Sequence, residues 1–85
     1  MKAVTIYTKE TCPYCMMAKN LLKQKGVNAF NEIRIDLDES QKAKMIEITQ
    51  RMTVPQIFIG ETHVGGFDDL SALNRDGKLD KLLSD

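Results

Sequence analysis

Two cysteines stand three residues apart near the start of the sequence, in the segment Cys12-Pro13-Tyr14-Cys15. At this spacing one thiol can attack a disulfide while the other resolves the mixed disulfide that results. The same pair could instead supply two of the four ligands of a structural zinc ion. Because His63 is the only histidine and there is no further cysteine, we favour the redox interpretation and expect no metal site.

The residues around this pair predict a strand, a turn and a helix. Val4 to Thr8 is rich in β-branched and aromatic residues and is predicted to be a strand. Pro13 suits the first helical turn, and an apolar stripe at helical spacing continues through Ala18 and Leu22. Gly26 follows as a typical helix stop.

This context predicts different roles for the two thiols. At the helix N-cap, the sulfur of Cys12 would face free backbone N–H groups and the positive end of the helix dipole. Such placements lower the pKa of a cysteine from about 8.5 to roughly 3.5–7.5. Lys9, three residues upstream, would add positive charge. We therefore predict that Cys12 is the nucleophile and that Cys15, one turn into the helix, is the more buried resolving thiol.

The middle of the chain predicts a second strand and a second helix. Hydrophobic and charged residues alternate in the strand, whose inward side chains would be Ile33, Ile35 and Leu37. The helix would be capped by Asp38 or Ser40. Its inward face is expected to carry Met45, Ile48 and Met52.

The last third predicts a hairpin and a helix. Two short strands, Gln56 to Ile59 and Thr62 to Gly65, flank Gly60-Glu61, a pair that suits a type II′ turn. A helix capped by Asp68 or Asp69 follows, and then a last apolar turn. The predicted order βαβαββα gives an α/β sandwich, with a mixed four-stranded sheet and helices on both faces.

Composition excludes several classes of protein. The 85 residues suit one domain, residues 1–85, with 42% hydrophobic residues. The 12 basic and 12 acidic residues balance, so we expect no nucleic-acid partner. No apolar run approaches the roughly 20 residues of a membrane-spanning helix, so we expect no membrane partner either. Charged residues interrupt the N-terminus before a signal-peptide core could form, and we expect a cytoplasmic protein.

Three segments in order resemble the dithiol class of glutaredoxins, which have the three-layer sandwich of the thioredoxin fold. They are Thr8 to Cys15, Thr53 to Ile59 and Gly65 to Leu70. The resemblance covers nearly the whole chain. It implies a monomeric electron-transfer enzyme of cell redox homeostasis, with glutathione as reductant. Its implied substrates are glutathionylated proteins and some protein disulfides, and ribonucleotide reductase joins them as a candidate partner.

The resemblance also assigns a glutathione site. In the family, the residue before a cis-proline binds the cysteinyl part of glutathione through its backbone. That residue corresponds to Val54 before Pro55, with Thr53 alongside. The glycyl carboxylate would be bound by the cations of Lys9 and Arg51.

The γ-glutamyl end of glutathione would lie at the helix that opens after Gly65-Gly66. The family positions there correspond to Phe67, Asp68 and Asp69. Backbone N–H groups at a helix start suit a carboxylate, and an aspartate suits the ammonium group of the ligand. Ordinary N-capping remains the alternative for either aspartate. Tyr14 would shield the thiol and contact the ligand.

Other residues depart from the family pattern. Gln50 stands where relatives often carry glycine, which would alter how Arg51 is presented. Met16 and Met17 replace a more polar pair, and we expect at least one of them in the core. The alternative is that they are exposed and form an apolar docking patch. His63 is interpreted as a residue of a strand face without chemistry.

Two other functions stay open. One is a thioredoxin substitute reduced by a flavoprotein, although such redoxins tend to lack the acidic pair Asp68-Asp69. The other is an iron–sulfur carrier, in which two subunits and two glutathiones hold a cluster. Relatives of that kind usually carry a single active-site cysteine, so Cys15 argues against it.

Overall fold

The computed structural model describes residues 1–84, which form a central sheet covered by helices. In chain order the elements are β1 (Val4–Thr8), α1 (Pro13–Gln24), β2 (Asn31–Arg34), α2 (Glu39–Thr49), β3 (Gln56–Ile59), β4 (Thr62–Gly65), α3 (Phe67–Arg75) and α4 (Leu79–Ser84). The predicted order is confirmed, and the last apolar turn forms a separate helix, α4.

The four strands lie in the order β2-β1-β3-β4. Strand β1 is parallel to β2, and β3 is antiparallel to both β1 and β4. The hairpin between β3 and β4 turns at Gly60, whose φ of 59° lies in the left-handed region that glycine adopts without strain. The sheet is therefore mixed, as the alternation of helices and strands predicts.

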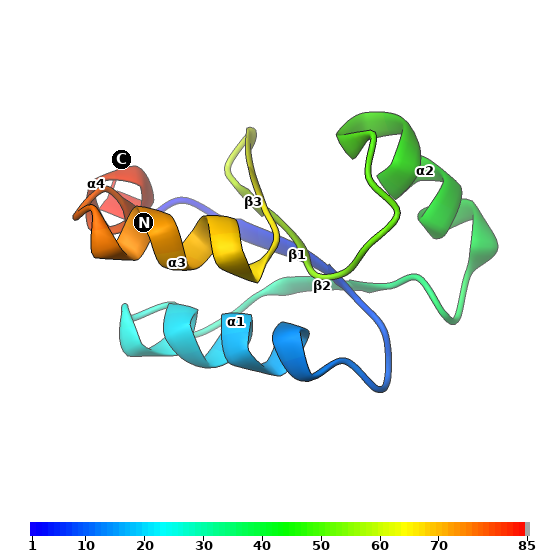
Figure 1. Ribbon diagram of the computed structural model, residues 1–85, viewed down its shortest axis with the longest axis horizontal. Coiled ribbons are helices and arrows are strands. Elements are labelled where there is room, and N and C mark those ends of the chain that lie inside the picture. The colour runs from blue at the N-terminus through cyan, green and yellow to red at the C-terminus, as the bar shows by residue number, and fades with distance from the viewer. Residues whose placement is uncertain (85) are drawn as a thin grey trace.

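Helices cover both faces of this sheet. Figure 1 shows α1 and α3 running side by side, with α2 on the other side of the strands. Ile6 and Ile57 point toward α1, α3 and α4, where they pack with Leu22, Leu70 and Leu83. Tyr7 points the other way and packs with Met45 of α2. The alternation along β1 thus separates the two layers of the core.

The second strand ends earlier than the sequence predicts. Ile35 is buried, but Leu37 is 74% exposed and lies in a turn. The chain turns there because Asp36 accepts hydrogen bonds from the Arg34 guanidinium and from the backbone N–H of Glu10. Asp38 then caps α2. The prediction that Leu37 faces the core is wrong.

The inward face of α2 is also narrower than predicted. Met45 is fully buried, whereas Ile48 and Met52 are 44% and 70% exposed. The helix ends at Thr49, whose hydroxyl donates to the Met45 carbonyl at 2.7 Å. Gln50 then reverses the chain with a φ of 60°. Met52 therefore lies beyond the helix, and the buried pair is Met45 and Thr49.

The expectation for the two methionines after the cysteine motif is wrong as well. Met16 and Met17 are both exposed. The buried stripe of α1 consists of Cys15, Ala18 and Leu22. Their spacing of three and four residues leaves Met16 and Met17 on the outer side of the helix.

The carboxylates of Glu32 and Asp36 form hydrogen bonds with residues on both sides of the cysteine motif. Glu32 of β2 accepts hydrogen bonds from the buried Thr8 hydroxyl at 2.6 Å and from the Lys19 ammonium at 2.7 Å. It thus connects the end of β1 to α1 through β2. These hydrogen bonds, Lys19 first, hold the pKa of Glu32 below its usual value. The Arg34 guanidinium lowers the pKa of Asp36 to about 2.

Acid is therefore expected to weaken the fold. A carboxylate with a lowered pKa in the folded state stabilises the protein at higher pH and loses that contribution as protons bind. Stability should fall as the pH drops from about 4.5 toward 2. Urea unfolding between about pH 6 and pH 2.5 measures this, and Glu32→Gln should flatten the acid limb. A variant with an unaltered acid limb would contradict the role of Glu32.

Candidate active site

The two cysteines lie at the start of α1. Cys12 is the N-cap residue, and Pro13 occupies the first turn. The backbone N–H of Cys15 donates to the sulfur of Cys12 at 3.2 Å. The two residues form a disulfide, with their Cα atoms 5.2 Å apart. The predicted strand–turn–helix context is confirmed, and a helix N–H reaches the sulfur that was expected to be the nucleophile.

The two sulfurs differ in their surroundings. Cys12 is 7% exposed and Cys15 is 2% exposed. The sulfur of Cys12 lies 3.8 Å from the carbonyl oxygen of Val54, in the loop before β3. Of the two, Cys12 is thus the sulfur next to the segment that the sequence assigned to glutathione.

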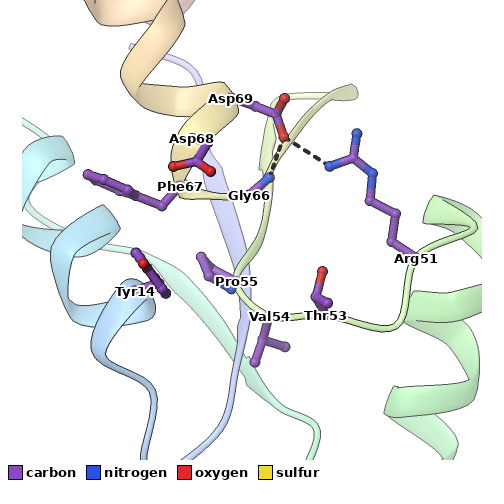
Figure 2. A pocket seen from close by; sticks show the side chains of 9 residues that line it. All are labelled: Tyr14, Arg51, Thr53, Val54, Pro55, Gly66, Phe67, Asp68 and Asp69. Atoms are coloured by element: carbon purple, nitrogen blue, oxygen red, sulfur yellow. Dashed lines mark hydrogen bonds and ion pairs between the residues drawn. The ribbon is translucent and has the colours of Figure 1, made fainter.

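A cavity of about 290 Å³ opens beside this loop. Figure 2 shows it between α1, the loop before β3 and the start of α3. Its lining consists of Tyr14, Arg51, Thr53, Val54, Pro55, Gly66, Phe67, Asp68 and Asp69. The structure therefore brings together eight of the nine residues that were expected to bind glutathione.

The loop before β3 forms one wall. The bond between Val54 and Pro55 is cis, as the resemblance predicts. Thr53 is exposed in this wall, and Val54 is partly exposed. Tyr14 of α1 and Phe67 of α3 also line the cavity, with their ring centres 6.1 Å apart.

The two aspartates of α3 have different environments. Asp69 accepts hydrogen bonds from the backbone N–H of Gly66 and from the Arg51 guanidinium, both at 2.9 Å. These contacts, Arg51 first, lower the pKa of Asp69. Asp68 is exposed and makes no side-chain hydrogen bond or ion pair with residues 1–84 (Figure 2). The N-cap of α3 is Gly66, so the prediction that Asp68 or Asp69 is the N-cap is wrong. Asp69, at the third position of the helix, instead accepts from the N-cap N–H, and Asp68 remains available to a ligand.

The two predicted cations lie apart. Arg51 reaches across the cavity to Asp69, and both side chains are close to half exposed. Lys9 is exposed in the turn after β1 and does not line the cavity. Arginine has five N–H donors, so the bond from one nitrogen to Asp69 leaves others free for a second carboxylate.

Gly66 lines the cavity and was not predicted as a site residue. It is the N-cap of α3, and the Gly65-Gly66 pair that ends β4 was the available signal. The sequence analysis also did not single out Gln56, which lies in β3 directly after the cavity wall. Gln56 is fully buried in a strand that is otherwise hydrophobic, and such a residue requires hydrogen-bond partners.

Comparison with known proteins agrees with this geometry. The glutaredoxin family profile matches residues 4–64. The chain belongs to the glutaredoxin family. It is 56% identical to a glutaredoxin of Pseudomonas aeruginosa over 84 residues, which cover 99% of each chain. It is 55% identical to glutaredoxin 3 of Escherichia coli, covering 98% of this chain and 99% of the relative.

Among solved structures, this glutaredoxin is similar to the buckwheat glutaredoxin–glutathione complex. The TM-score is 0.89 at 32% identity, over 98% of this chain and 77% of the other. The fold is thus the thioredoxin-like fold of glutaredoxins. Membership of this family indicates that the protein is a thiol-disulfide oxidoreductase that uses glutathione.

Residues 1–84 of this glutaredoxin contain neither a helix suited to span a membrane nor a cluster of metal-ligating side chains. No helix among them is long and apolar enough to cross a membrane. Nor do they contain a group of three or more His, Cys, Asp or Glu side chains placed to hold a metal ion.

The contacts of the two sulfurs lead to a prediction for the reduced glutaredoxin. Iodoacetamide at about pH 6.5 should alkylate Cys12 well before Cys15, because the helix N-terminus stabilises the thiolate of Cys12. Mass mapping after short exposures measures the order. Earlier modification of Cys15 would contradict the assignment, and a urea-unfolded sample provides the control in which the two should react alike.

Proposed function

We propose that this glutaredoxin reduces glutathione mixed disulfides, and some protein disulfides, with Cys12 as nucleophile and Cys15 as resolving thiol. The single observation that carries the proposal is the position of the Cys12 sulfur. It lies at a helix N-terminus and 3.8 Å from a backbone oxygen of the cavity wall. A ligand bound against that wall would bring its own sulfur to Cys12.

With a glutathionylated substrate, the Cys12 thiolate attacks the glutathione sulfur. A disulfide forms between Cys12 and glutathione, and the substrate leaves as a thiolate that takes a proton from water. A second glutathione thiolate then attacks the bound glutathione sulfur. Oxidised glutathione forms and the Cys12 thiolate is released.

With a protein disulfide, the Cys12 thiolate attacks one sulfur of the substrate, which breaks the substrate disulfide, forms a mixed disulfide with Cys12 and releases the other sulfur as the first thiolate. The Cys15 thiolate then attacks the Cys12 sulfur, which releases the second substrate thiolate and leaves the Cys12–Cys15 disulfide. Two glutathiones reduce that disulfide and become oxidised glutathione. The disulfide of the structure corresponds to the oxidised form in this cycle.

The cavity supports glutathione as the ligand. Val54 offers its backbone to the cysteinyl part, as in the addition of a strand, with Thr53, Pro55 and Tyr14 around it. The start of α3, at Phe67, suits the γ-glutamyl carboxylate, because the dipole and the N–H groups there favour anions.

The charged side chains of the site would complete this recognition. The exposed carboxylate of Asp68 suits the ammonium group of the ligand. Arg51 would bind the glycyl carboxylate through the nitrogens that Asp69 leaves free. Lys9 would have to turn toward the cavity to join it.

The test is turnover of a small glutathione mixed disulfide, coupled to glutathione reductase and followed by nicotinamide oxidation. The expected result is saturable turnover that Cys12→Ser abolishes. A folded wild-type protein that turns over protein disulfides with a flavoprotein reductase, but not the glutathione mixed disulfide, would overturn the proposal.

The two aspartates should respond differently to substitution. Asp68→Asn is expected to raise the KM for the mixed disulfide about tenfold without lowering stability, because a hydrogen bond to a charged group contributes about 1.5–3 kcal/mol. Asp69→Asn should lower the free energy of unfolding by about 1 kcal/mol, because it weakens the cap. Asp76→Asn, at the other end of α3, is the control and should alter KM little. Equal KM effects of the first two substitutions would contradict the division of roles.

We also propose a domain organisation, a location and partners for this glutaredoxin. Residues 1–85 would act as a single glutaredoxin domain and as a monomer, since the site described uses residues of one chain. We place the activity in the cytoplasm, where glutathione keeps thiols reduced. Glutathionylated proteins, and ribonucleotide reductase as one disulfide client, are the proposed partners.

A further inference from the structure

Behind the cavity wall, a chain of hydrogen bonds connects His63 of β4 to Thr53. Nε2 of His63 lies 2.8 Å from the side-chain oxygen of Gln56. The side-chain nitrogen of Gln56 donates to the Thr53 carbonyl at 3.0 Å and to the Thr53 hydroxyl at 3.3 Å. Gln56 is fully buried, whereas Thr53 is exposed at the cavity. These hydrogen bonds therefore lead from His63, through the buried side chain of Gln56, to the cavity.

The carbonyl group of Thr53 determines which atom is the donor in each of these hydrogen bonds. The Thr53 carbonyl can only accept, so the amide nitrogen of Gln56 must face it. The amide oxygen of Gln56 then faces His63, and Nε2 of His63 must carry a proton. The Gln56 amide nitrogen can only donate, so the Thr53 hydroxyl is an acceptor in its contact with that nitrogen. The hydroxyl's own proton is therefore free for another acceptor.

We propose that Gln56 and His63 are positioning residues that make Thr53 a hydrogen-bond donor to the ligand. Their chain orients the hydroxyl of Thr53 so that its proton points to an acceptor in the cavity. The acceptor is a carbonyl or carboxylate oxygen of the bound peptide. This inference rests on the proposed function, in which that peptide is glutathione.

The packing around His63 holds this chain of hydrogen bonds in place. The ring of His63 stacks on Phe58 with the ring centres 4.9 Å apart. His63 and Phe58 are paired across the hairpin, so the strand register fixes the position of the imidazole. Within residues 1–84, no buried side-chain nitrogen or oxygen lacks a partner. Loss of the proton on Nε2 of His63 would therefore leave the side-chain oxygen of Gln56 without a hydrogen-bond donor. The amide group of Gln56 would then be free to rotate.

The experiment uses two substitutions of His63. His63→Phe keeps a ring on Phe58 but removes the donor, whereas His63→Gln restores a neutral donor at similar reach. With a short glutathionylated peptide, His63→Phe should raise KM about three- to tenfold with kcat unchanged, the size expected for one hydrogen bond. His63→Gln should return KM to within about twofold of the wild type. Thr62→Val, on the same strand, is the control and should keep the wild-type KM.

A folded His63→Phe protein with wild-type KM overturns the inference while leaving the proposed function intact. Failure of the wild type to turn over the peptide would overturn the proposed function instead. A second measurement needs no variant. Nitrogen NMR of the imidazole at about pH 8 should find the proton on Nε2, and a proton on Nδ1 would overturn the inference.

Discussion

Replacing Cys15 with serine is expected to separate two activities of this glutaredoxin. The Cys15→Ser protein should reduce glutathione mixed disulfides at the wild-type rate or faster. It should lose most of its reduction of protein disulfides. Cys12→Ser should abolish both.

The reason lies in the sequence of bond exchanges. In the reduction of a glutathione mixed disulfide, Cys12 and free glutathione perform every step, and Cys15 can only divert the intermediate into the internal disulfide. The N–H that stabilises the Cys12 thiolate belongs to the backbone of residue 15, so serine preserves it. In the reduction of a protein disulfide, by contrast, the Cys15 thiolate must release the trapped substrate.

Both activities should be measured on the same preparations, with glutathione and glutathione reductase present. Met16→Gln provides a control, because Met16 is exposed on the helix beside Cys15 and has no step in either reaction. If Cys15→Ser is inactive toward the glutathione mixed disulfide, the monothiol route is wrong. A dithiol cycle like that of thioredoxin would then explain the protein better.

Local sequence patterns predict the strand–turn–helix around the cysteines because the physical causes are themselves local. Pro13 is suited to the first helical turn, and the residues from Val4 to Thr8 favour a strand. The hairpin at Gly60 is equally local, and its bounds agree with the prediction. By contrast, Leu37 and Met52 were misplaced because side-chain bonds and chain reversals end their elements early.

The site was predictable mainly through the resemblance, because its parts come from three distant segments. No local pattern shows that Arg51 would reach Asp69, 18 residues later. The separate roles of Asp68 and Asp69 also depend on which carboxylate returns to the N–H of Gly66. Periodicity does not contain that information, since both residues lie in the same helical turn.

The second large effect is expected for Gly65→Ala, at the end of β4. Gly65 has a φ of 115°, which L-residues rarely adopt. A Cβ there would overlap the Asp69 carboxylate and lie 2.9 Å from an Arg51 nitrogen. The carboxylate and the guanidinium would have to shift, which weakens the bonds of Asp69 to Gly66 and Arg51. We expect a loss of about 2–4 kcal/mol, from backbone strain and the lost cap together, and a raised KM for the glutathionylated peptide.

Gly77→Ala separates the cost of backbone strain from the cost of the lost helix cap. Gly77 has a φ of 74°, but a Cβ there would meet nothing within 4 Å. The substitution should therefore cost only the backbone strain of about 1–2 kcal/mol and leave KM unchanged.

A double-mutant cycle isolates the contact between residue 65 and Asp69. In an Asp69→Ala background, Gly65→Ala should cost clearly less than in the wild type, because the carboxylate that it displaces is gone. Urea unfolding of the four proteins measures this coupling. Additive losses would mean that Gly65 stabilises the fold only through its backbone conformation, and that the space it leaves for Asp69 contributes nothing to stability.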